Sequence, residues 1–388
     1  REIPVFIDAL FESASGFTTT GASILTEVES LSHASLFWRS FTHWIGGMGV
    51  LVFIMAFLPL SGGQNMHIMR AESPGPSVSK LVPRVRTTAM LLYLIYIVLT
   101  LSELLVLLIA GMDFFDALNT SLATAGTGGF GFRNDSFASF PARQQWIVGI
   151  FMALFSINFS SYFFLIHGRV KEFFNLEARV FFGILFGATA LITWNIASSF
   201  PSVSDAARNA FFTVSSVMST TGFVSTDFNL WPEFSKTVLV LLMFGGACAG
   251  STCGGMKLSR IVILFKGLVR EFRTAIHPKQ VKRITVDGRP VEEGVVHTVF
   301  IYAFCLFAVL AGSVLLISAD RADLTTNVTA VITTLNNVGP GLNLVGPTGN
   351  FAFYSGFSKA VLIFDMLAGR LELFPMLLLF YPRTWKRH

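Results

Sequence analysis

One arrangement occurs four times in this chain and restricts the folds that the chain can adopt. A short apolar segment of about three helical turns leads into a bend rich in threonine and glycine, then a polar segment and a long apolar segment. The bends are residues 16–22, 124–130, 215–223 and 333–340. Because three turns are too few to cross a bilayer, four such units predict a ring of re-entrant loops around one axis.

The backbone of such a ring has a defined chemistry. A re-entrant loop leaves carbonyl groups without helical partners, which is tolerated at membrane depth only where they line a wet cavity. Glycine permits positive φ, so that consecutive carbonyls turn toward one axis and replace the hydration shell of a small cation. Each short helix points its C-terminal end, which favours positive charge, toward the same place. A single Thr-Gly pair is more typical of an ordinary turn, but four copies in matching context favour a cation filter.

The bends therefore supply the candidate ion-binding residues. We expect four glycines to form one ring of the filter: Gly21, Gly128, Gly222 and Gly339. We expect the ions to contact backbone oxygens of the residues before them: Thr19, Thr20, Gly126, Thr127, Thr220, Thr221, Asn337 and Val338.

Composition places these loops in a membrane. Apolar residues make up 53% of the 388 positions and charged residues 13%, about half the share of charge in a soluble domain. The sequence contains no long polar block for a separate soluble domain, and no basic run interleaved with aromatic residues that would indicate nucleic-acid binding. Cys248 and Cys253 lack the spacing and the His pair of a zinc site, so we interpret them as small membrane residues.

The hydropathy pattern predicts an all-α integral membrane protein. Short helices are expected at residues 6–15, 114–125, 206–218 and 328–335, and long helices at residues 41–60, 88–110, 146–166, 178–197, 237–265, 295–318 and 358–380. Basic residues cluster in alternate connections, at residues 61–87, 169–179 and 257–293 and at the C-terminus. The positive-inside rule places these connections in the cytoplasm and every bend on the outer side.

The segment at residues 237–265 is long enough to span, but a continuous helix is not expected there. Its middle reads Gly-Gly-Ala-Cys-Ala-Gly-Ser-Thr-Cys-Gly-Gly, and each glycine costs about 1 kcal/mol relative to alanine in a helix interior. A broken helix with an intramembrane loop beneath the filter explains these residues and predicts a gate. The candidate gating residues are Gly245, Gly246, Gly250, Ser251, Thr252, Gly254, Gly255 and Lys257. A glycine-rich packing seam is the alternative.

Arg370 lies inside the last long apolar segment. An ionisable residue within a span is a functional hypothesis by default, and neither Asp365 nor Glu372 has the helical spacing to pair with it. If the long helices after the bends face the pore, Arg370 reaches the axis near the glycine-rich loop and opposes cation passage. Alternatively, its side chain extends to the cytoplasmic interface, and spacing alone does not decide between the two.

These motifs resemble the Trk/Ktr/HKT superfamily of potassium transporters, and within it the bacterial TrkH branch. The four bends carry the resemblance, together with residues 44–49, 250–257, 277–279 and 369–372, over essentially the whole chain. The resemblance implies four covalently joined helix–pore-helix–helix units with pseudo-four-fold symmetry around one path. It also implies a homodimer in the bacterial inner membrane and a cytoplasmic, TrkA-like regulatory partner that binds nucleotides.

The resemblance also assigns roles to single residues. The family's filter glycines map onto Gly21, Gly128, Gly222 and Gly339, its gating loop onto residues 245–255, and its pore arginine onto Arg370, which favours the gate over the interface. Gly21, where sodium-preferring plant relatives have serine, points to K⁺ as the bound ion. We expect no organic cofactor on this chain.

The four repeats are expected at residues 1–60, 61–175, 176–275 and 276–388. The chain starts at the first short helix, so we expect the first outer helix to be missing from it. The fourth bend has Asn337-Val338 where the others carry Gly or Thr, and the second is one residue shorter from Asp116 than the first is from Asp8. These departures predict an imperfectly four-fold site with weaker discrimination than a symmetric potassium channel.

Two other functions compete with channel-like potassium uptake. Ion-coupled transport, with H⁺ or Na⁺ as co-ion, would need carboxylates in the spans, of which Glu103 is the clearest. A membrane-embedded enzyme would need a nucleophile–base pair or metal ligands at membrane depth. His43, Cys253 and Asp365 are isolated in sequence and no His-Glu-x-x-His pattern occurs, so we predict that the protein is not an enzyme.

Overall fold

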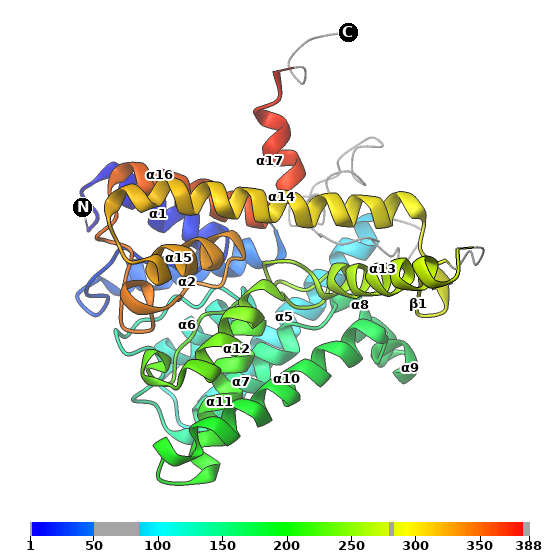
Figure 1. The fold of residues 1–388 in the computed structure, drawn as a ribbon. Coiled ribbons are helices and arrows are strands. Elements are labelled where there is room, and N and C mark those ends of the chain that lie inside the picture. The colour runs from blue at the N-terminus through cyan, green and yellow to red at the C-terminus, as the bar shows by residue number, and fades with distance from the viewer. Residues whose placement is uncertain (1, 50–84, 279–282, 383–388) are drawn as a thin grey trace.

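The computed structural model describes residues 2–49, 85–278 and 283–382, and their regular structure is almost entirely helical (Figure 1). The α-helices are α1 (Phe6–Phe17), α2 (His33–Met48), α5 (Val85–Ile109), α6 (Phe114–Ala125), α7 (Ala142–Phe155), α8 (Phe159–Ile166), α9 (Val170–Phe173), α10 (Leu176–Ile196), α11 (Val203–Met218), α12 (Glu233–Phe244), α13 (Leu258–Ile276), α14 (Glu293–Ile317), α15 (Leu324–Leu335), α16 (Gly356–Arg370) and α17 (Leu373–Leu379). The 3-10 turns are η1 (Ala197–Ser199), η2 (Phe228–Leu230), η3 (Ser318–Asp320) and η4 (Asn343–Val345), and strands β1 (Thr285–Val286) and β2 (Arg289–Pro290) form an antiparallel hairpin.

The four predicted short helices are present as α1, α6, α11 and α15. Asp113, Ser202 and Asp323 cap the last three, because each side chain accepts a hydrogen bond from a backbone N–H of the first turn. A hydrogen bond from the Thr326 hydroxyl lowers the pKa of Asp323 below its usual value. The N-terminal ends of α6, α11 and α15 are therefore capped locally, whereas α1 has no side-chain cap.

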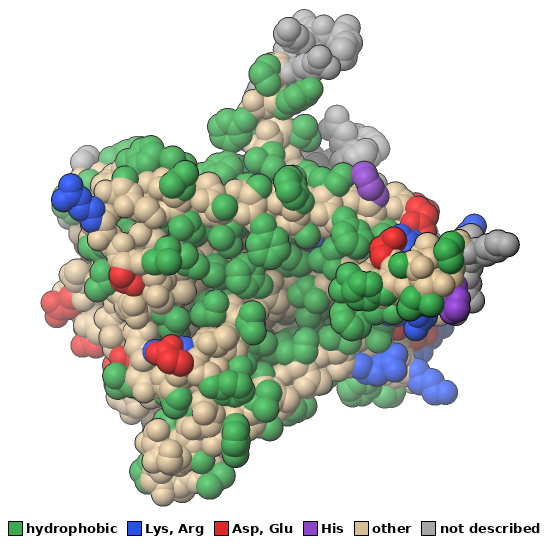
Figure 2. All heavy atoms as spheres, viewed as in Figure 1, with side chains coloured by type: hydrophobic (Ala, Val, Ile, Leu, Met, Phe, Trp, Pro, Cys, Tyr) green, Lys and Arg blue, Asp and Glu red, His purple; other side chains and the backbone are tan. Residues whose placement is uncertain are grey.

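Among the described residues, three helices are long and apolar enough to cross a membrane: Thr87–Ile109, Leu176–Ser199 and Glu293–Asp320. In Figure 2, apolar side chains cover the middle of the visible face and charged side chains gather toward its two ends. This distribution is typical of a protein in a bilayer. The second half of the long helix predicted at residues 41–60 and most of the first basic connection, residues 50–84, lie outside the described residues, as do residues 279–282 and 383–388.

Two segments predicted as unbroken helices are interrupted. The segment at residues 146–166 consists of α7 and α8, which meet at an angle of 93°. The segment at residues 358–380 consists of α16 and α17, which are separated by Leu371 and by Glu372, whose φ is 74°. The break predicted within residues 237–265 is present, since α12 ends at Phe244 and α13 begins at Leu258.

The inner helices α2, α7, α12 and α16 join the four units in cyclic order. Each packs against the short helix before it and against the short helix of the next unit. Thus α2 contacts α1 and α6, α7 contacts α6 and α11, α12 contacts α11 and α15, and α16 contacts α15 and α1. The last pair joins the end of the chain to its beginning, and Phe11, Val331 and Met366 from these helices share one hydrophobic core.

Candidate functional site

All four short helices end in the same backbone turn. A residue with left-handed φ follows the helix although it is not glycine: Thr19 (54°), Thr127 (53°), Thr220 (55°) and Asn337 (53°). The next N–H donates to the carbonyl five residues earlier, from Thr20 to Ser15, Gly128 to Ala123, Thr221 to Ser216 and Val338 to Thr333. This is the Schellman ending, which normally uses glycine at the left-handed position. Another residue there costs about 1–2 kcal/mol, so four copies of one strained turn indicate a functional requirement.

Two residues after each strained position stands a glycine with positive φ: Gly21 (79°), Gly129 (75°), Gly222 (84°) and Gly339 (98°). A side chain on any of them would come within 3.0 Å of a carbonyl oxygen in the next loop. The contacts are Gly21 with Gly128, Gly129 with Thr221, Gly222 with Val338, and Gly339 with Thr20. Since the fourth loop contacts the first, the four backbones form a closed ring. Glycine alone combines this φ with so close an approach.

In the second loop, the predicted ring glycine is wrong by one residue. Gly129, rather than Gly128, has the φ and the contacts of the other ring glycines. Gly128 stands where Thr20 stands in the first loop, so that its carbonyl belongs to the ring, and Gly126 is the C-cap of α6. Gly129 lies 13 residues after Asp116, as Gly21 lies 13 residues after Asp8. This equal spacing was the signal in the sequence, and the predicted shortening of the second loop is wrong.

A depression of about 160 Å³ opens onto the ring. Its lining includes all four ring glycines, and the segments that follow them complete its walls. The four loops therefore meet at the floor of one open depression.

The glycine-rich segment between α12 and α13 is an irregular loop. Gly245 and Met256, at its two ends, form a parallel bridge. Gly246 packs closely against the backbone of Gly254, and Gly250 and Gly255 have left-handed φ values of 73° and 69°. These glycines serve a turning backbone, so the alternative of a packing seam within a helix is wrong.

The tip of this intramembrane loop contacts the ring. The N–H of Gly254 donates to the hydroxyl of Thr220 at 2.8 Å. A side chain at Gly254 would approach the Cβ of Asn337 to 2.6 Å. Thr220 and Asn337 both occupy strained left-handed positions, so the loop is bound to the end of the short helices themselves.

The break between α7 and α8 supports the same loop. There, the carbonyl of Ser156 accepts the N–H of Cys248 at 3.1 Å, and the N–H of Phe159 donates to the carbonyl of Gly250 at 3.0 Å. In a continuous helix, the carbonyl of Ser156 and the N–H of Phe159 would bond within the helix, whereas here they bond to the intramembrane loop. Hydropathy carries no information about such tertiary bonds, which is why it predicted one unbroken helix.

Arg370 ends α16, and its guanidinium lies beneath the first loop of the ring. Nη1 donates to the hydroxyl of Thr19 at 3.1 Å and to the carbonyl of Thr252 at 2.7 Å. Nη2 donates to the carbonyls of Gly46 and Gly47 in α2. Because these partners come from the ring, the intramembrane loop and an inner helix, the side chain does not extend to the membrane interface.

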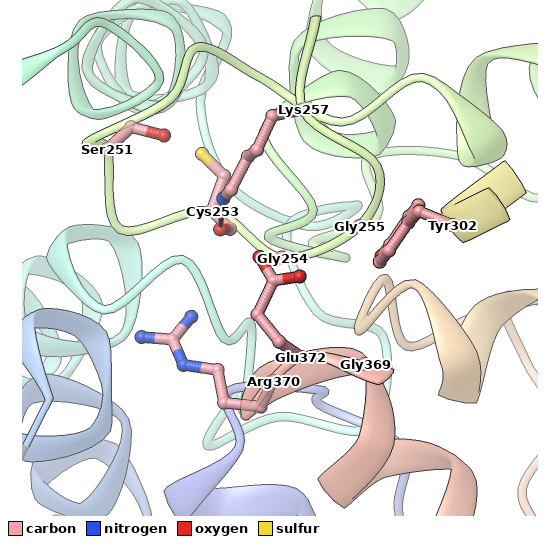
Figure 3. A pocket seen from close by; sticks show the side chains of 9 residues that line it. All are labelled: Ser251, Cys253, Gly254, Gly255, Lys257, Tyr302, Gly369, Arg370 and Glu372. Carbon is pink, nitrogen blue, oxygen red and sulfur yellow. Dashed lines mark hydrogen bonds between the residues drawn. The ribbon is translucent and has the colours of Figure 1, made fainter. Parts of the chain in front are cut away.

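A small cavity lies between the intramembrane loop and the end of α16 (Figure 3). Arg370 and Glu372 leave the end of α16 in different directions there. The buried side chain of Lys257 donates to the carbonyl of Cys253 and so closes the loop on itself. Glu372 accepts two hydrogen bonds of 2.7 Å from Arg260 in α13, and the Arg260 guanidinium lies 4.0 Å from the centre of the Tyr302 ring. An ion pair thus joins the break after α16 to the helix that follows the loop.

Two sets of buried side chains behind the ring were not predicted. The Phe130 N–H donates to Nε2 of His43 at 3.2 Å, and Nδ1 lies 2.9 Å from the carbonyl of Gly16. Because Nε2 accepts, the proton is on Nδ1, which donates to Gly16. Glu12 and Arg39 form a buried ion pair at 2.8 Å. Both sets connect the first two units, since Arg39 also donates to the carbonyl of Gly131 at 3.0 Å, and neither has a sequence motif that reveals it.

Comparison with known proteins identifies the family. The TrkH family model, described as a cation transport protein, matches residues 2–387. The Trk system potassium uptake protein TrkH of Escherichia coli (strain K12) is 39% identical over 387 residues, or 98% of this chain and 79% of that protein. The protein of that name from Halomonas elongata is 35% identical over 389 residues, or 98% and 80%.

The fold agrees with the crystal structure of the potassium transporter TrkH from Vibrio parahaemolyticus. The TM-score is 0.87 at 34% identity, and the alignment covers 99% of this chain and 80% of that chain. The relatives are transporters rather than enzymes, which confirms the prediction that the protein is not an enzyme. The chain belongs to the TrkH family of membrane cation transport proteins.

Proposed function

We propose that this protein takes up potassium through the closed ring of backbone carbonyls. The observation that carries the proposal is the cyclic contact of each ring glycine with a carbonyl of the next loop. Carbonyl oxygens in such a ring replace the water around a dehydrated K⁺, and the C-terminal ends of four short helices add favourable potential. The names of the relatives, potassium uptake proteins and a potassium transporter, support K⁺ as the transported ion.

The ion-binding groups in this proposal are main-chain oxygens of the eight loop residues before the ring glycines: Thr19, Thr20, Thr127, Gly128, Thr220, Thr221, Asn337 and Val338. The intramembrane loop and Arg370 form the gate. A positive charge beneath a cation site opposes the next ion along the path, so conduction requires Arg370 and the loop to move together.

The cellular setting is also part of the proposal. The chain acts in the bacterial inner membrane, crosses it several times, assembles as a homodimer and is regulated by a cytoplasmic, TrkA-like, nucleotide-binding subunit. The support is the family membership and the basic residues of α13, among them Lys266 and Arg273. Addition of the regulatory subunit to the purified protein should change its rate of flux.

Ion flux into liposomes tests the proposed function. Purified protein should carry K⁺ down its own gradient faster than Na⁺, without a co-ion. Equal rates for the two ions, or no K⁺ flux in the absence of a second gradient, would contradict the proposal.

Ion-coupled uptake is a second candidate, favoured by one buried carboxyl in α5. Glu103 is fully buried, and the side chain of Thr124 in α6 interacts with its carboxyl. Under this mechanism, Glu103→Gln abolishes uptake that is driven by an H⁺ or Na⁺ gradient. Under the channel-like mechanism, the same variant leaves K⁺ flux along its own gradient within about twofold, a free-energy change of about 0.4 kcal/mol.

A further inference from the structure

One oxygen of Glu177 contacts both the intramembrane loop and the helix that follows it. Glu177 lies in the first turn of α10, and its Oε1 accepts the N–H of Ala249 at 2.8 Å and the N–H of Ser259 at 2.9 Å. Ala249 belongs to the loop and Ser259 to the first turn of α13. A single carboxylate thereby ties the loop to the helix into which the loop continues.

We infer that Glu177 is a positioning residue that holds the gating loop against the ring. The inference rests on the proposed function, because it assigns a role in the proposed gate. The inference gives a role to the carboxylate of Glu177, which the proposed filter and Arg370 do not involve.

The chemistry of the contact fits this role. A helix N-terminus presents unpaired N–H groups and the positive end of the helix dipole, which together favour a carboxylate. The N-cap residue of α13, Lys257, makes no side-chain capping bond, so Glu177 supplies the cap from another helix. A hydrogen bond to an ionised acceptor is about twice as strong as one between neutral groups.

The turn that carries Glu177 is itself fixed in place. The side chain of Asn175 caps it by accepting the N–H of Ala178 at 2.8 Å. Asp287, in the hairpin of β1 and β2, accepts the N–H of Leu176 at 2.8 Å. The carboxylate is therefore presented by a turn held from two directions, which gives a preorganised contact rather than an adaptable surface charge.

Three variants isolate this contact. Glu177→Ala removes the acceptor, Glu177→Gln keeps an oxygen at the same distance from the backbone, and Glu172→Ala removes a carboxylate of the exposed ion pair with Arg169 as a matched control. K⁺ flux into liposomes without the regulatory subunit should rise about fivefold in Glu177→Ala, equivalent to about 1 kcal/mol. Flux through Glu177→Gln should rise by less than in Glu177→Ala, because the amide oxygen can keep both hydrogen bonds but not the negative charge. Flux through Glu172→Ala should stay near that of the wild type, and the K⁺/Na⁺ ratio should be the same in all three.

Thiol labelling gives a second readout that does not depend on flux. Cys253 lies in the loop and is 2% exposed, so a water-soluble maleimide should label it several times faster in Glu177→Ala, with mass spectrometry distinguishing it from Cys248 and Cys305. Wild-type labelling in Glu177→Ala would overturn the inference, whatever the flux. If the alanine variant does not fold, Glu177→Asp, whose carboxylate is one methylene shorter, takes its place. Wild-type protein without K⁺ flux would refute the proposed function, while the labelling would still decide the role of Glu177.

Discussion

The four loops of the ring and the four inner helices beneath them belong to the same repeated unit, yet only the loops are alike. The strained residues of the loops have φ values between 53° and 55°. By contrast, α2 ends at Met48, α7 bends by 93° into α8, α12 gives way to a loop, and α16 stops at Arg370. A site that surrounds an ion needs equivalent oxygens on every side, whereas an obstruction needs to come from one side only. Under the proposed function, symmetry is therefore found where the ion would bind and is lost where its passage would be controlled.

Disturbing one ring glycine should have the largest effect. In Gly222→Ser the new side chain meets the carbonyl of Val338 and the ring of Pro340 at a φ of 84°. We expect the K⁺/Na⁺ flux ratio in liposomes to fall about 30-fold, because strain and displacement of one carbonyl together amount to about 2 kcal/mol.

The matched control for that variant is Gly187→Ser in α10, where a side chain would meet nothing within 4 Å. Its flux ratio should equal that of the wild type. An unchanged ratio in Gly222→Ser would show that the loops are not equivalent parts of one filter.

Removing the obstruction should act on rate and not on selectivity. Arg370→Ala eliminates a positive charge beneath the ring along with its bonds to Thr19 and Thr252. We expect K⁺ flux to rise about tenfold at an unaltered K⁺/Na⁺ ratio. The exposed Arg169→Ala, which removes the same charge from the surface, should leave flux as it is. A rate equal to the wild type in Arg370→Ala would exclude Arg370 from the gate.

A smaller effect should separate two threonines that occupy the same position in different loops. The hydroxyl of Thr220 accepts the Gly254 N–H of the intramembrane loop, whereas that of Thr127 donates to Gly126 in its own loop. Thr220→Val should therefore raise K⁺ flux about threefold, for the loss of one hydrogen bond that contributes about 0.6 kcal/mol, and Thr127→Val should not. Equal behaviour of the two variants would mean that the loop does not act through this contact.

Local signals in the sequence predicted the ring better than the region beneath it. Short helices and Thr-Gly bends repeat along the chain, and the glycine run at residues 245–255 is visible without any structure. The breaks after Phe155 and Arg370 have no such signal, because distant partners stabilise them: the backbone of Cys248 in one case and the side chain of Arg260 in the other. Gly128 was predicted as the ring glycine because it is the first glycine after Thr127. It stands, however, at the position where the other loops carry threonine or valine, and the ring glycine is the next residue, Gly129.

The cyclic order of the glycine–carbonyl contacts determines how the proposed filter would lose its selectivity. Each loop supports one neighbouring loop and is supported by the other, and the closed ring has no end at which these contacts could begin to break. A displacement of one loop is therefore transmitted to both neighbouring loops and, through them, to the loop opposite. A change in any one loop should accordingly displace all four, so that the ring loses its discrimination between K⁺ and Na⁺ as a whole.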